Sequence, residues 1–140
     1  MLDTVAIACD HGGFALKEAL KAALPEVSWL DLGTDGTGSV DYPDFANKLA
    51  DAIKAGKAGR GILVCGSGIG ISIAANRHPH IRCALVHDVT TARLCRQHND
   101  ANVLALGGRT TGEAVAKDCV DAFLNTAFEG GRHQKRIDKL

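Results

Sequence analysis

The hydrophobic and polar positions of the chain fall into two patterns that alternate along its length. Short runs of apolar, often β-branched residues predict strands. Longer stretches, in which apolar residues recur every three or four positions, separate these runs and predict helices with one buried face. Such an alternation is typical of a parallel sheet covered by helices on both faces. The expected strands are residues 4–9, 27–32, 61–65, 83–86 and 103–106.

Residues that favour helix ends bound the helices between these strands. The first helix is expected to end at Pro25, and Asp44 is suited to cap the second. A third helix is expected to begin near Ile71, after a glycine-rich turn, and a fourth to cover residues 90–97. The apolar stripe of a last long helix is expected at Val115, Cys119, Ala122 and Phe123.

The chain has 140 residues, a length that fits one compact domain. We therefore expect residues 1–140 to form one doubly wound α/β domain of the Rossmann-like class, with a mostly five-stranded parallel sheet. In such folds ligands bind at the carboxyl ends of the strands. Those ends are expected to carry Asp10-His11, residues 65–70, His87-Asp88 and Gly107-Gly108-Arg109.

Composition argues against several classes of partner. Lys and Arg together number 16, as do Asp and Glu, so the formal net charge is zero. Because nucleic-acid and membrane-surface binding usually need an excess of basic charge, we expect neither nucleic acid nor membrane as a partner. No apolar run approaches the roughly 20 residues of a membrane span. The segment Met1-Leu2-Asp3-Thr4 lacks the basic start of a signal peptide, so we expect a cytoplasmic protein.

The five cysteines, at positions 9, 65, 83, 95 and 119, are odd in number and form no C-x-x-C pair. A structural zinc site or a thioredoxin-like redox pair is therefore not expected. In a reducing cytosol, four of the five should behave as small buried hydrophobic residues. Reactivity of any one of them would have to come from its neighbours.

The sharpest local motif is Gly66-Ser67-Gly68-Ile69-Gly70, between an expected strand and an expected helix. Glycines let the backbone approach a ligand closely, and the free N–H groups of a helix start attract anions. The motif therefore suits an anion or an oxyanion, and the alternative is a tight turn without a ligand. It is neither a G-x-G-x-x-G motif, because Ile71 replaces the third glycine, nor a P-loop, because no Gly-Lys-Ser/Thr follows.

Cys65 immediately precedes this motif. A thiol beside a helix N-terminus suits a nucleophile or a general base. The alternative is an inert cysteine at the end of a buried strand. A phosphatase loop is excluded, because the sixth residue after Cys65 is Ile71 rather than arginine.

Further candidates lie later in the chain. The His98-Asn99-Asp100 segment offers acid–base chemistry near neutral pH, or alternatively a helix C-cap in which histidine is favoured. Arg109, Arg132 and Arg136 are suited to bind a phosphate. The last two would share one face of a helix, and the alternative reading is a solvated basic tail.

Together these segments resemble the type B ribose-5-phosphate isomerases, a family that also includes galactose-6-phosphate and allose-6-phosphate isomerases. The similar segments follow family order over essentially the whole chain, and the third and fourth are long and distinctive. They are Asp10-His11-Gly12-Gly13-Phe14, Asp41-Tyr42-Pro43, residues 65–76 (CGSGIGISIAAN), residues 96–104 (RQHNDANVL) and Glu129-Gly130-Gly131-Arg132-His133.

The resemblance implies an aldose–ketose isomerase that works through an enediol, without metal or cofactor. By this resemblance His98 opens the furanose ring and Cys65 moves a proton between C2 and C1. Backbone N–H groups of Gly66, Gly68, Ile69 and Gly70, helped by Ser67, would stabilise the enediolate. Sugar hydroxyls would be bound by Asp10, Asp41, Tyr42 and Asn99, and the phosphate by His11, Arg109, Arg132 and Arg136.

The resemblance also implies a homodimer or a dimer of dimers, in which a tail of about residues 129–140 reaches a partner subunit. Two positions differ from relatives: Ser67 stands where threonine is common, and Ile71 stands where another branch places a glutamate base. Cys65 is then the one candidate base. The expected substrate is ribose 5-phosphate. The alternatives are a four- or six-carbon sugar phosphate, or a non-catalytic sugar-phosphate-binding domain, against which Cys65 and His98 together argue.

Overall fold

A computed structural model describes residues 4–140 and contains one five-stranded sheet in which every strand pairing is parallel. The strand order is β2-β1-β3-β5-β4. The predicted sheet is confirmed, with shifts of one or two residues at strand ends. The strands are β1 Thr4–Cys9, β2 Ser28–Asp31, β3 Arg60–Cys65, β4 Cys83–Leu85 and β5 Val103–Gly107.

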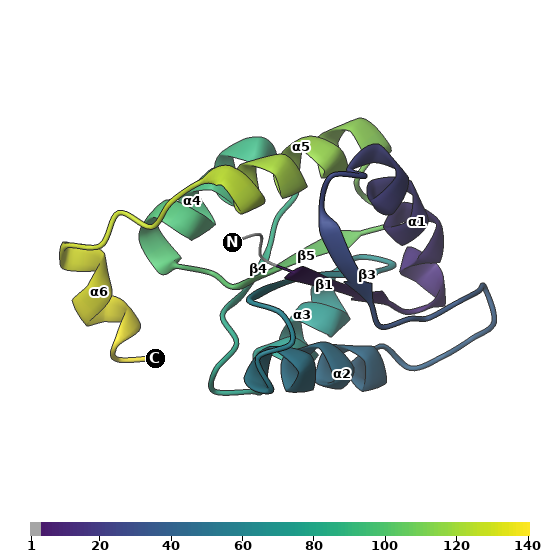
Figure 1. Cartoon of the computed structure of the whole chain (residues 1–140), viewed down its shortest axis with the longest axis horizontal. Coiled ribbons are helices and arrows are strands. Elements are labelled where there is room, and N and C mark those ends of the chain that lie inside the picture. The colour runs from purple at the N-terminus through teal and green to yellow at the C-terminus, as the bar shows by residue number, and fades with distance from the viewer. Residues whose placement is uncertain (1–3) are drawn as a thin grey trace.

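Helices cover both faces of this sheet, as predicted (Figure 1). The helices α1, α4 and α5 pack on one face, and α2 and α3 pack on the other. A short 3₁₀ helix, η1, connects β1 to α1. The helix bounds are η1 His11–Gly13, α1 Phe14–Ala23, α2 Tyr42–Lys54, α3 Ile69–Ala75, α4 Val89–Asn99, α5 Glu113–Asn125 and α6 Arg132–Ile137.

The central strand β3 shows why the sheet needs both layers of helices. Ile62 and Val64 belong to the core under α1, α4 and α5, whereas Leu63 and Cys65 belong to the core over α2 and α3. All four are at least 96% buried. A strand that is buried on both faces reads as a continuous apolar run, which is the pattern that its sequence shows.

Three predicted details of the helices were wrong. Helix α2 begins at Tyr42 with Asp41 as its N-cap, so Asp44 lies in the first turn rather than before it. Helix α3 begins at Ile69, two residues earlier than expected, because the turn closes within the glycine motif. Val115 is 43% exposed, and the buried face of α5 runs through Ala116 instead. Both residues are small and apolar, so composition alone did not fix the phase of this helix.

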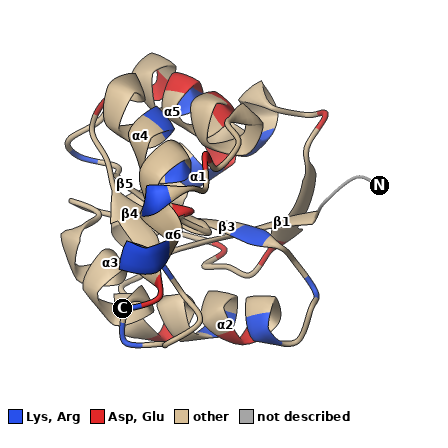
Figure 2. Cartoon of the chain, turned by 90° about the vertical axis from the view of Figure 1, so that its left-hand side faces the viewer, with Lys and Arg blue, Asp and Glu red and all other residues tan. Residues whose placement is uncertain are grey.

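Helix α6 extends beyond the end of α4, away from the rest of the molecule (Figure 1). Within the described residues its neighbour among the helices is α4. Basic residues give this end of the molecule its blue ribbon in Figure 2. The tail expected over residues 129–140 is therefore a turn followed by a short helix, and Arg132 and Arg136 both lie on that helix.

No helix among residues 4–140 is long and apolar enough to cross a membrane. Residues 1–3, which carry most of the argument against a signal peptide, lie outside the described residues.

Candidate active site

Cys65 ends strand β3 at the carboxyl edge of the sheet, and the chain turns directly into α3. The Sγ atom of Cys65 accepts a hydrogen bond of 3.1 Å from the N–H of Gly68. One residue later the N–H of Ile69 donates to the Ser67 hydroxyl oxygen at 3.2 Å. The turn therefore fixes the thiol and the start of α3 as one unit.

Gly68 makes this turn possible. Its φ angle of +78° lies in the left-handed region, which residues with a side chain rarely adopt. A Cβ atom at this position would lie 2.9 Å from the backbone carbon of Leu106 and 2.6 Å from a methyl carbon of Leu85. Glycine is thus required here both for conformation and for space.

The N–H groups of Gly66, Ser67 and Gly70 donate to no other group within residues 4–140. They lie at the positive end of α3, where unpaired N–H groups favour negative charge. Together with the thiol they border a hollow of about 340 Å³. It is lined by Asp10, Tyr42, Cys65, Gly66, Ser67, Gly70, Arg109 and Thr110. The structure therefore brings together seven of the predicted site residues, and adds Thr110, which sequence reasoning missed.

Asp10 has a structural task in this hollow in addition to the predicted one. It is 93% buried, and its Oδ1 atom accepts hydrogen bonds from the N–H groups of Gly12 at 2.9 Å and Gly13 at 3.2 Å. The second oxygen, Oδ2, receives no hydrogen bond from residues 4–140. One carboxylate oxygen thus holds η1, and the other is unpaired within residues 4–140.

Arg109 lines this hollow, whereas His11, the first residue of η1, does not. The Nδ1 atom of His11 accepts a 3.1 Å hydrogen bond from the N–H of Val40, which places the proton of a neutral ring on Nε2. The guanidinium of Arg109 lies beside Gly66, and its backbone N–H donates to the Gly66 carbonyl at 2.9 Å. Asp41 does not line the hollow and borders a separate one next to α2.

His98 and Asn99 lie at the opposite edge of the sheet. Cys65 is paired with Gly107, the last residue of β5, whereas α4 ends at Asn99 just before the first residue of β5. The two groups are therefore separated by about the length of a five-residue strand, roughly 15 Å. Arg132 and Arg136 lie on α6, at the same end as His98. Within one chain the predicted site is divided into two halves.

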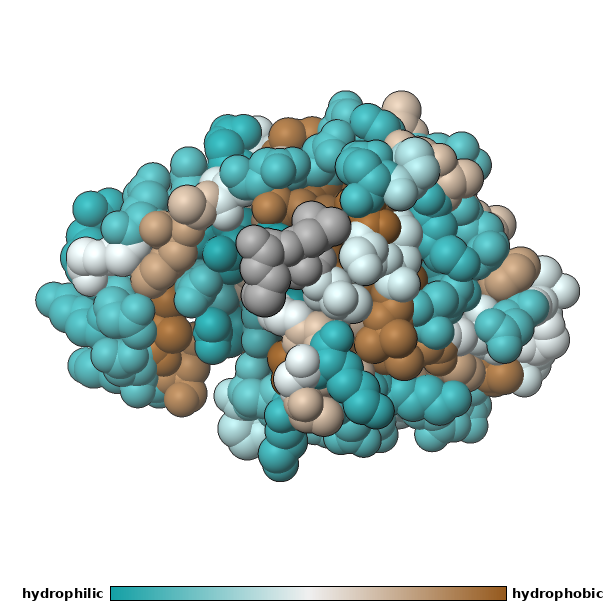
Figure 3. Space-filling view, viewed as in Figure 1, coloured by the Kyte–Doolittle hydropathy of each residue, from teal (hydrophilic) through white to brown (hydrophobic). Residues whose placement is uncertain are grey.

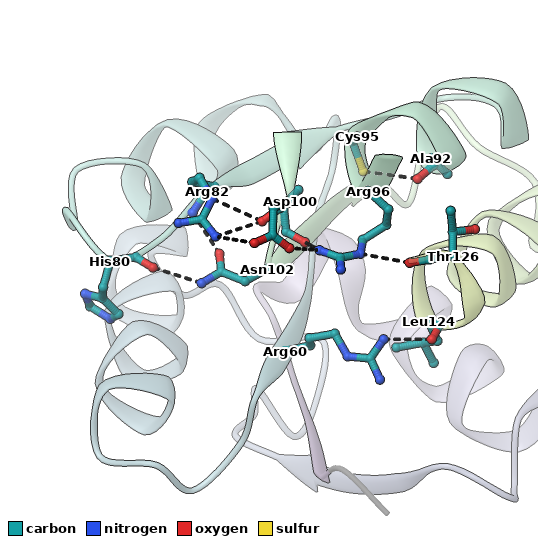
Figure 4. A network of polar contacts seen from close by, with 11 residues as sticks. Arg60, His80, Arg82, Ala92, Cys95, Arg96, Asp100, Asn102, Leu124 and Thr126 are labelled. Atoms are coloured by element: carbon teal, nitrogen blue, oxygen red, sulfur yellow. Dashed lines mark hydrogen bonds and ion pairs between the residues drawn. The ribbon is translucent and has the colours of Figure 1, made fainter. Parts of the chain in front are cut away.

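A network of charged groups fixes the end of α4 that carries His98 and Asn99 (Figure 4). Asp100 caps the helix in the left-handed conformation, with a φ angle of +46°. Its side chain accepts from Arg96 at 2.8 Å and Arg82 at 3.4 Å, and its carbonyl accepts from Arg82 at 2.9 Å. The helix-cap alternative is therefore met in the structure: Asp100 is the C-cap, and His98 lies in the last turn of α4, where a histidine is favoured.

A second hollow, of about 520 Å³, lies at this end of the molecule. Asn99, Ile137 and Leu140 contribute to its lining, together with residues of the α3–β4 connection. Figure 3 shows apolar side chains on the inner side of the α6 end, beside the gap that separates it from the body of the molecule.

Three of the other four cysteines, Cys9, Cys95 and Cys119, are buried as predicted, and Cys83 is partly buried. Burial raises the pKa of the Cys9, Cys95 and Cys119 thiols to about 11 and that of Cys83 to about 12. These thiols are protonated at neutral pH and line no part of the hollow beside Gly66. Cys65 differs from them because it opens onto that hollow.

Sequence reasoning assigned no role to Glu129 and His133, although both lie in a segment that resembles the isomerases. The His133 ring stacks on the His98 ring, with ring centroids 4.4 Å apart. Glu129 lies beside both rings. Their contact depends on the turn at Gly130 and Gly131 before α6, so the four-residue spacing gave no signal for it.

Comparison with known proteins identifies the family of this chain. The chain matches the Ribose/Galactose Isomerase family over residues 5–140. It is 46% identical over 138 residues to ribose-5-phosphate isomerase B of Escherichia coli, covering 97% of this chain and 93% of that protein.

Solved structures are equally similar. A ribose 5-phosphate isomerase from Thermotoga maritima superposes with a TM-score of 0.96 at 49% identity, covering 98% of this chain and 96% of that one. Ribose-5-phosphate isomerase B from Mycoplasma genitalium, with bound ribulose-5-phosphate, gives 0.91 at 43% identity, covering 97% and 92%. Sequence and structure thus agree over nearly the full length, and the chain belongs to the ribose/galactose isomerase family.

Proposed function

We propose that this protein interconverts ribose 5-phosphate and ribulose 5-phosphate, and that Cys65 is its catalytic base. The observation that carries the proposal is the placement of the Cys65 sulfur beside three unpaired N–H groups in one hollow. Removing a proton from carbon next to a carbonyl needs a base and a stabilised oxyanion at the same time. The glycine turn supplies both within a few residues.

The reaction is an internal transfer that needs no outside oxidant or reductant. The Cys65 thiolate takes the proton from C2 of the open-chain aldose, and the resulting enediolate oxygen binds the N–H groups of Gly66, Ser67 and Gly70. The same thiol then returns a proton to C1, while the proton of the C2 hydroxyl moves to the C1 oxygen. A free thiol must stay reduced for this chemistry, so we expect the protein to act in the cytoplasm.

The second half of the site is proposed to come from a partner subunit. His98, Arg132 and Arg136 lie a strand's length from Cys65, too far to act on the same five-carbon sugar within one chain. Ile69 and Ile73 on α3 are 53% and 54% exposed, which leaves an apolar surface beside the Cys65 hollow. A two-fold dimer would bring the α6 end of each chain to that surface of the other and complete two equivalent sites.

The substrate phosphate is proposed to bind between the two halves. Arg109 and the Nε2–H of His11 lie near the Cys65 hollow, and Arg132 and Arg136 would approach from the partner. A phosphate dianion suits several guanidinium donors at once. The phosphate of the substrate would then hold the two halves of the site together.

Mixing of two inactive variants tests the shared site. Cys65→Ala and Arg136→Ala homodimers should both be nearly inactive on ribose 5-phosphate. Co-refolded in equal amounts, they should regain roughly a quarter of wild-type activity, because half the dimers are mixed and each has one intact site. No recovery from mixed dimers, isolated with two different affinity tags, would contradict sharing.

Substrate choice needs a separate assay. Four-, five- and six-carbon aldose phosphates should be compared by kcat/KM, with ribose 5-phosphate expected to be the best. If a six-carbon aldose phosphate gave a higher kcat/KM, the proposed substrate would be wrong and the proposed mechanism would still stand. Tight binding of sugar phosphates without turnover would instead favour a non-catalytic binding domain.

A further inference from the structure

Glu129, His98 and His133 form a cluster at the junction of α4 and α6. The Oε1 atom of Glu129 lies 3.9 Å from Nε2 of His98 and 3.7 Å from Nε2 of His133. The N–H of Glu129 donates to the carbonyl of Gln97 at 3.1 Å, which ties the cluster to the last turn of α4. One carboxylate therefore faces two imidazoles.

The cluster is unlike a metal site, although its three ligand atoms lie within 4.8 Å of one another. The rings of His98 and His133 are stacked, with an angle of 17° between their planes. An imidazole binds a metal in the plane of its ring, and two nearly parallel stacked planes do not converge on one ion. The arrangement instead holds one ring flat against the other.

The two imidazoles differ in their surroundings. The His98 side chain is 41% exposed, whereas that of His133 is 8% exposed and its Nε2 atom has no hydrogen-bond partner within residues 4–140. Burial lowers the pKa of His133, and the nearby His98, Arg132 and Arg136 lower it further against the opposing charge of Glu129. The charged form of His133 is therefore disfavoured, and the same Glu129 carboxylate also faces the more exposed His98.

Helices α4 and α6 both contribute charged groups near the Glu129–His98–His133 cluster. Helix α4 contributes His98 and Arg96, and the guanidinium of Arg96 is already bound to Asp100 and to the carbonyl of Thr126. Helix α6 contributes the cations Arg132 and Arg136. Glu129 is thus the one anion that faces the two rings among the described residues.

We propose that Glu129 and His133 are positioning residues for His98: His133 holds the ring by stacking, and Glu129 stabilises its protonated form. The inference rests on the proposed function, in which His98 opens the furanose ring. In that step the bond between C1 and the ring oxygen breaks, a proton leaves the C1 hydroxyl and a proton reaches the ring oxygen. A residue that both gives and takes a proton needs its charged form stabilised and its ring fixed.

Ring opening and enolisation can be measured separately, which makes the proposal testable. Ribose 5-phosphate is mainly cyclic, whereas ribulose 5-phosphate has no hydroxyl free to close a five-membered ring. Exchange of the C1 hydrogen of ribulose 5-phosphate with deuterated water therefore reports proton transfer at Cys65 without ring opening. The variants are Glu129→Gln, His133→Ala and His133→Phe, with Glu26→Gln as a charge-matched control on an exposed, distant loop.

Glu129→Gln should lower kcat/KM for ribose 5-phosphate about tenfold and keep deuterium exchange within about twofold of wild type. His133→Ala should also lose about tenfold on the cyclic substrate, and His133→Phe, which keeps the stack, about threefold or less. Glu26→Gln should match wild type in both assays.

Equal losses in the two assays, or no recovery of activity in His133→Phe relative to His133→Ala, would overturn the positioning role. Retained deuterium exchange shows that each variant is folded and assembled, so misfolding cannot imitate the expected result. The proposed function fails in a different way: Cys65→Ala would then keep deuterium exchange, whatever the Glu129 and His133 variants do.

Discussion

The hydrogen bond from the N–H of Gly68 to the sulfur of Cys65, 3.1 Å long, joins the proposed base to the proposed oxyanion site. Gly68 is the last residue before α3, and its positive φ angle turns the backbone so that the thiol and the unpaired N–H groups meet. A base and an anion site on separate loops could move relative to each other. Here a single turn sets both positions.

Replacing Cys65 with alanine should abolish proton transfer. We expect kcat to fall by about 10²–10⁴-fold, the usual loss when a general base is removed. Deuterium exchange into ribulose 5-phosphate should fall equally, because the other carboxylate that lines the hollow, Asp10, is proposed to bind a sugar hydroxyl and not to move the proton. The measurement is initial rate and exchange rate at several pH values.

Cys119→Ala is a matched control for this variant. Cys119 is fully buried in α5, and burial raises the pKa of its thiol to about 11. The control should lose about 1 kcal/mol of stability to the small cavity and keep its activity. Activity above about a tenth of wild type in Cys65→Ala would count against its role as base.

Gly68→Ala should damage stability and activity together. The added methyl group meets the backbone of Leu106 and requires a strained φ angle, for an expected loss of about 2–3 kcal/mol in the free energy of unfolding. Urea unfolding should reveal this loss. Gly36→Ala is a suitable control, since nothing lies within 4 Å of its added Cβ atom. If Gly68→Ala were as stable and active as that control, the turn would not set the geometry of the site.

His98→Asn should separate ring opening from enolisation. Activity on cyclic ribose 5-phosphate should fall about 100-fold, because acid–base help with the ring oxygen is lost. Deuterium exchange into ribulose 5-phosphate should stay within a few-fold of wild type, because the base and the N–H groups are unchanged. If activity on ribose 5-phosphate and deuterium exchange into ribulose 5-phosphate fell by the same factor, His98 would not act in ring opening.

Much of the carboxyl edge could be predicted from sequence, because its signals are local. An apolar run ending in Cys65, followed at once by a glycine motif, defines a strand, a turn and a helix start within ten residues. The resemblance to isomerases then supplied the roles. Thr110 escaped notice because its place depends on how the β5–α5 loop folds back over Ser67, which no pattern in the loop encodes.

The second half of the site was harder to predict for a different reason. Periodicity places His98 at the end of a helix, but only the sheet topology shows that this end is opposite Cys65. The stacking of His133 on His98 depends on the path of residues 126–131, which contain two glycines with positive φ angles and no periodic pattern. Contacts between distant segments of this kind are visible in the structure alone.

A partly buried ion pair holds the loop that leads from β2 toward the site. The Lys17 ammonium, whose side chain is 1% exposed, donates to Asp31 at 2.7 Å, and Lys21 donates to the other oxygen at 2.6 Å. Asp31 also accepts from the N–H of Gly33 at 2.9 Å. Burial alone would raise the pKa of Asp31, but the hydrogen bonds from Lys17, Lys21 and Gly33 outweigh it and lower the pKa below 3.8.

Asp31→Asn should therefore destabilise the protein at neutral pH and alter its response to acid. Because the pKa of Asp31 is lower in the folded state, its ionised form adds stability above pH 3.8, and this is lost as the pH falls through the folded value. Removing the charge leaves Lys17 buried with a weaker partner, for an expected loss of about 3 kcal/mol at pH 7. Urea unfolding between pH 7 and pH 2.5 should show this deficit shrinking below pH 3.8. Asp35→Asn, an exposed substitution of the same charge, should follow wild type throughout. If the loss in the free energy of unfolding were the same at every pH, the charge of Asp31 would not be the source of its contribution to stability.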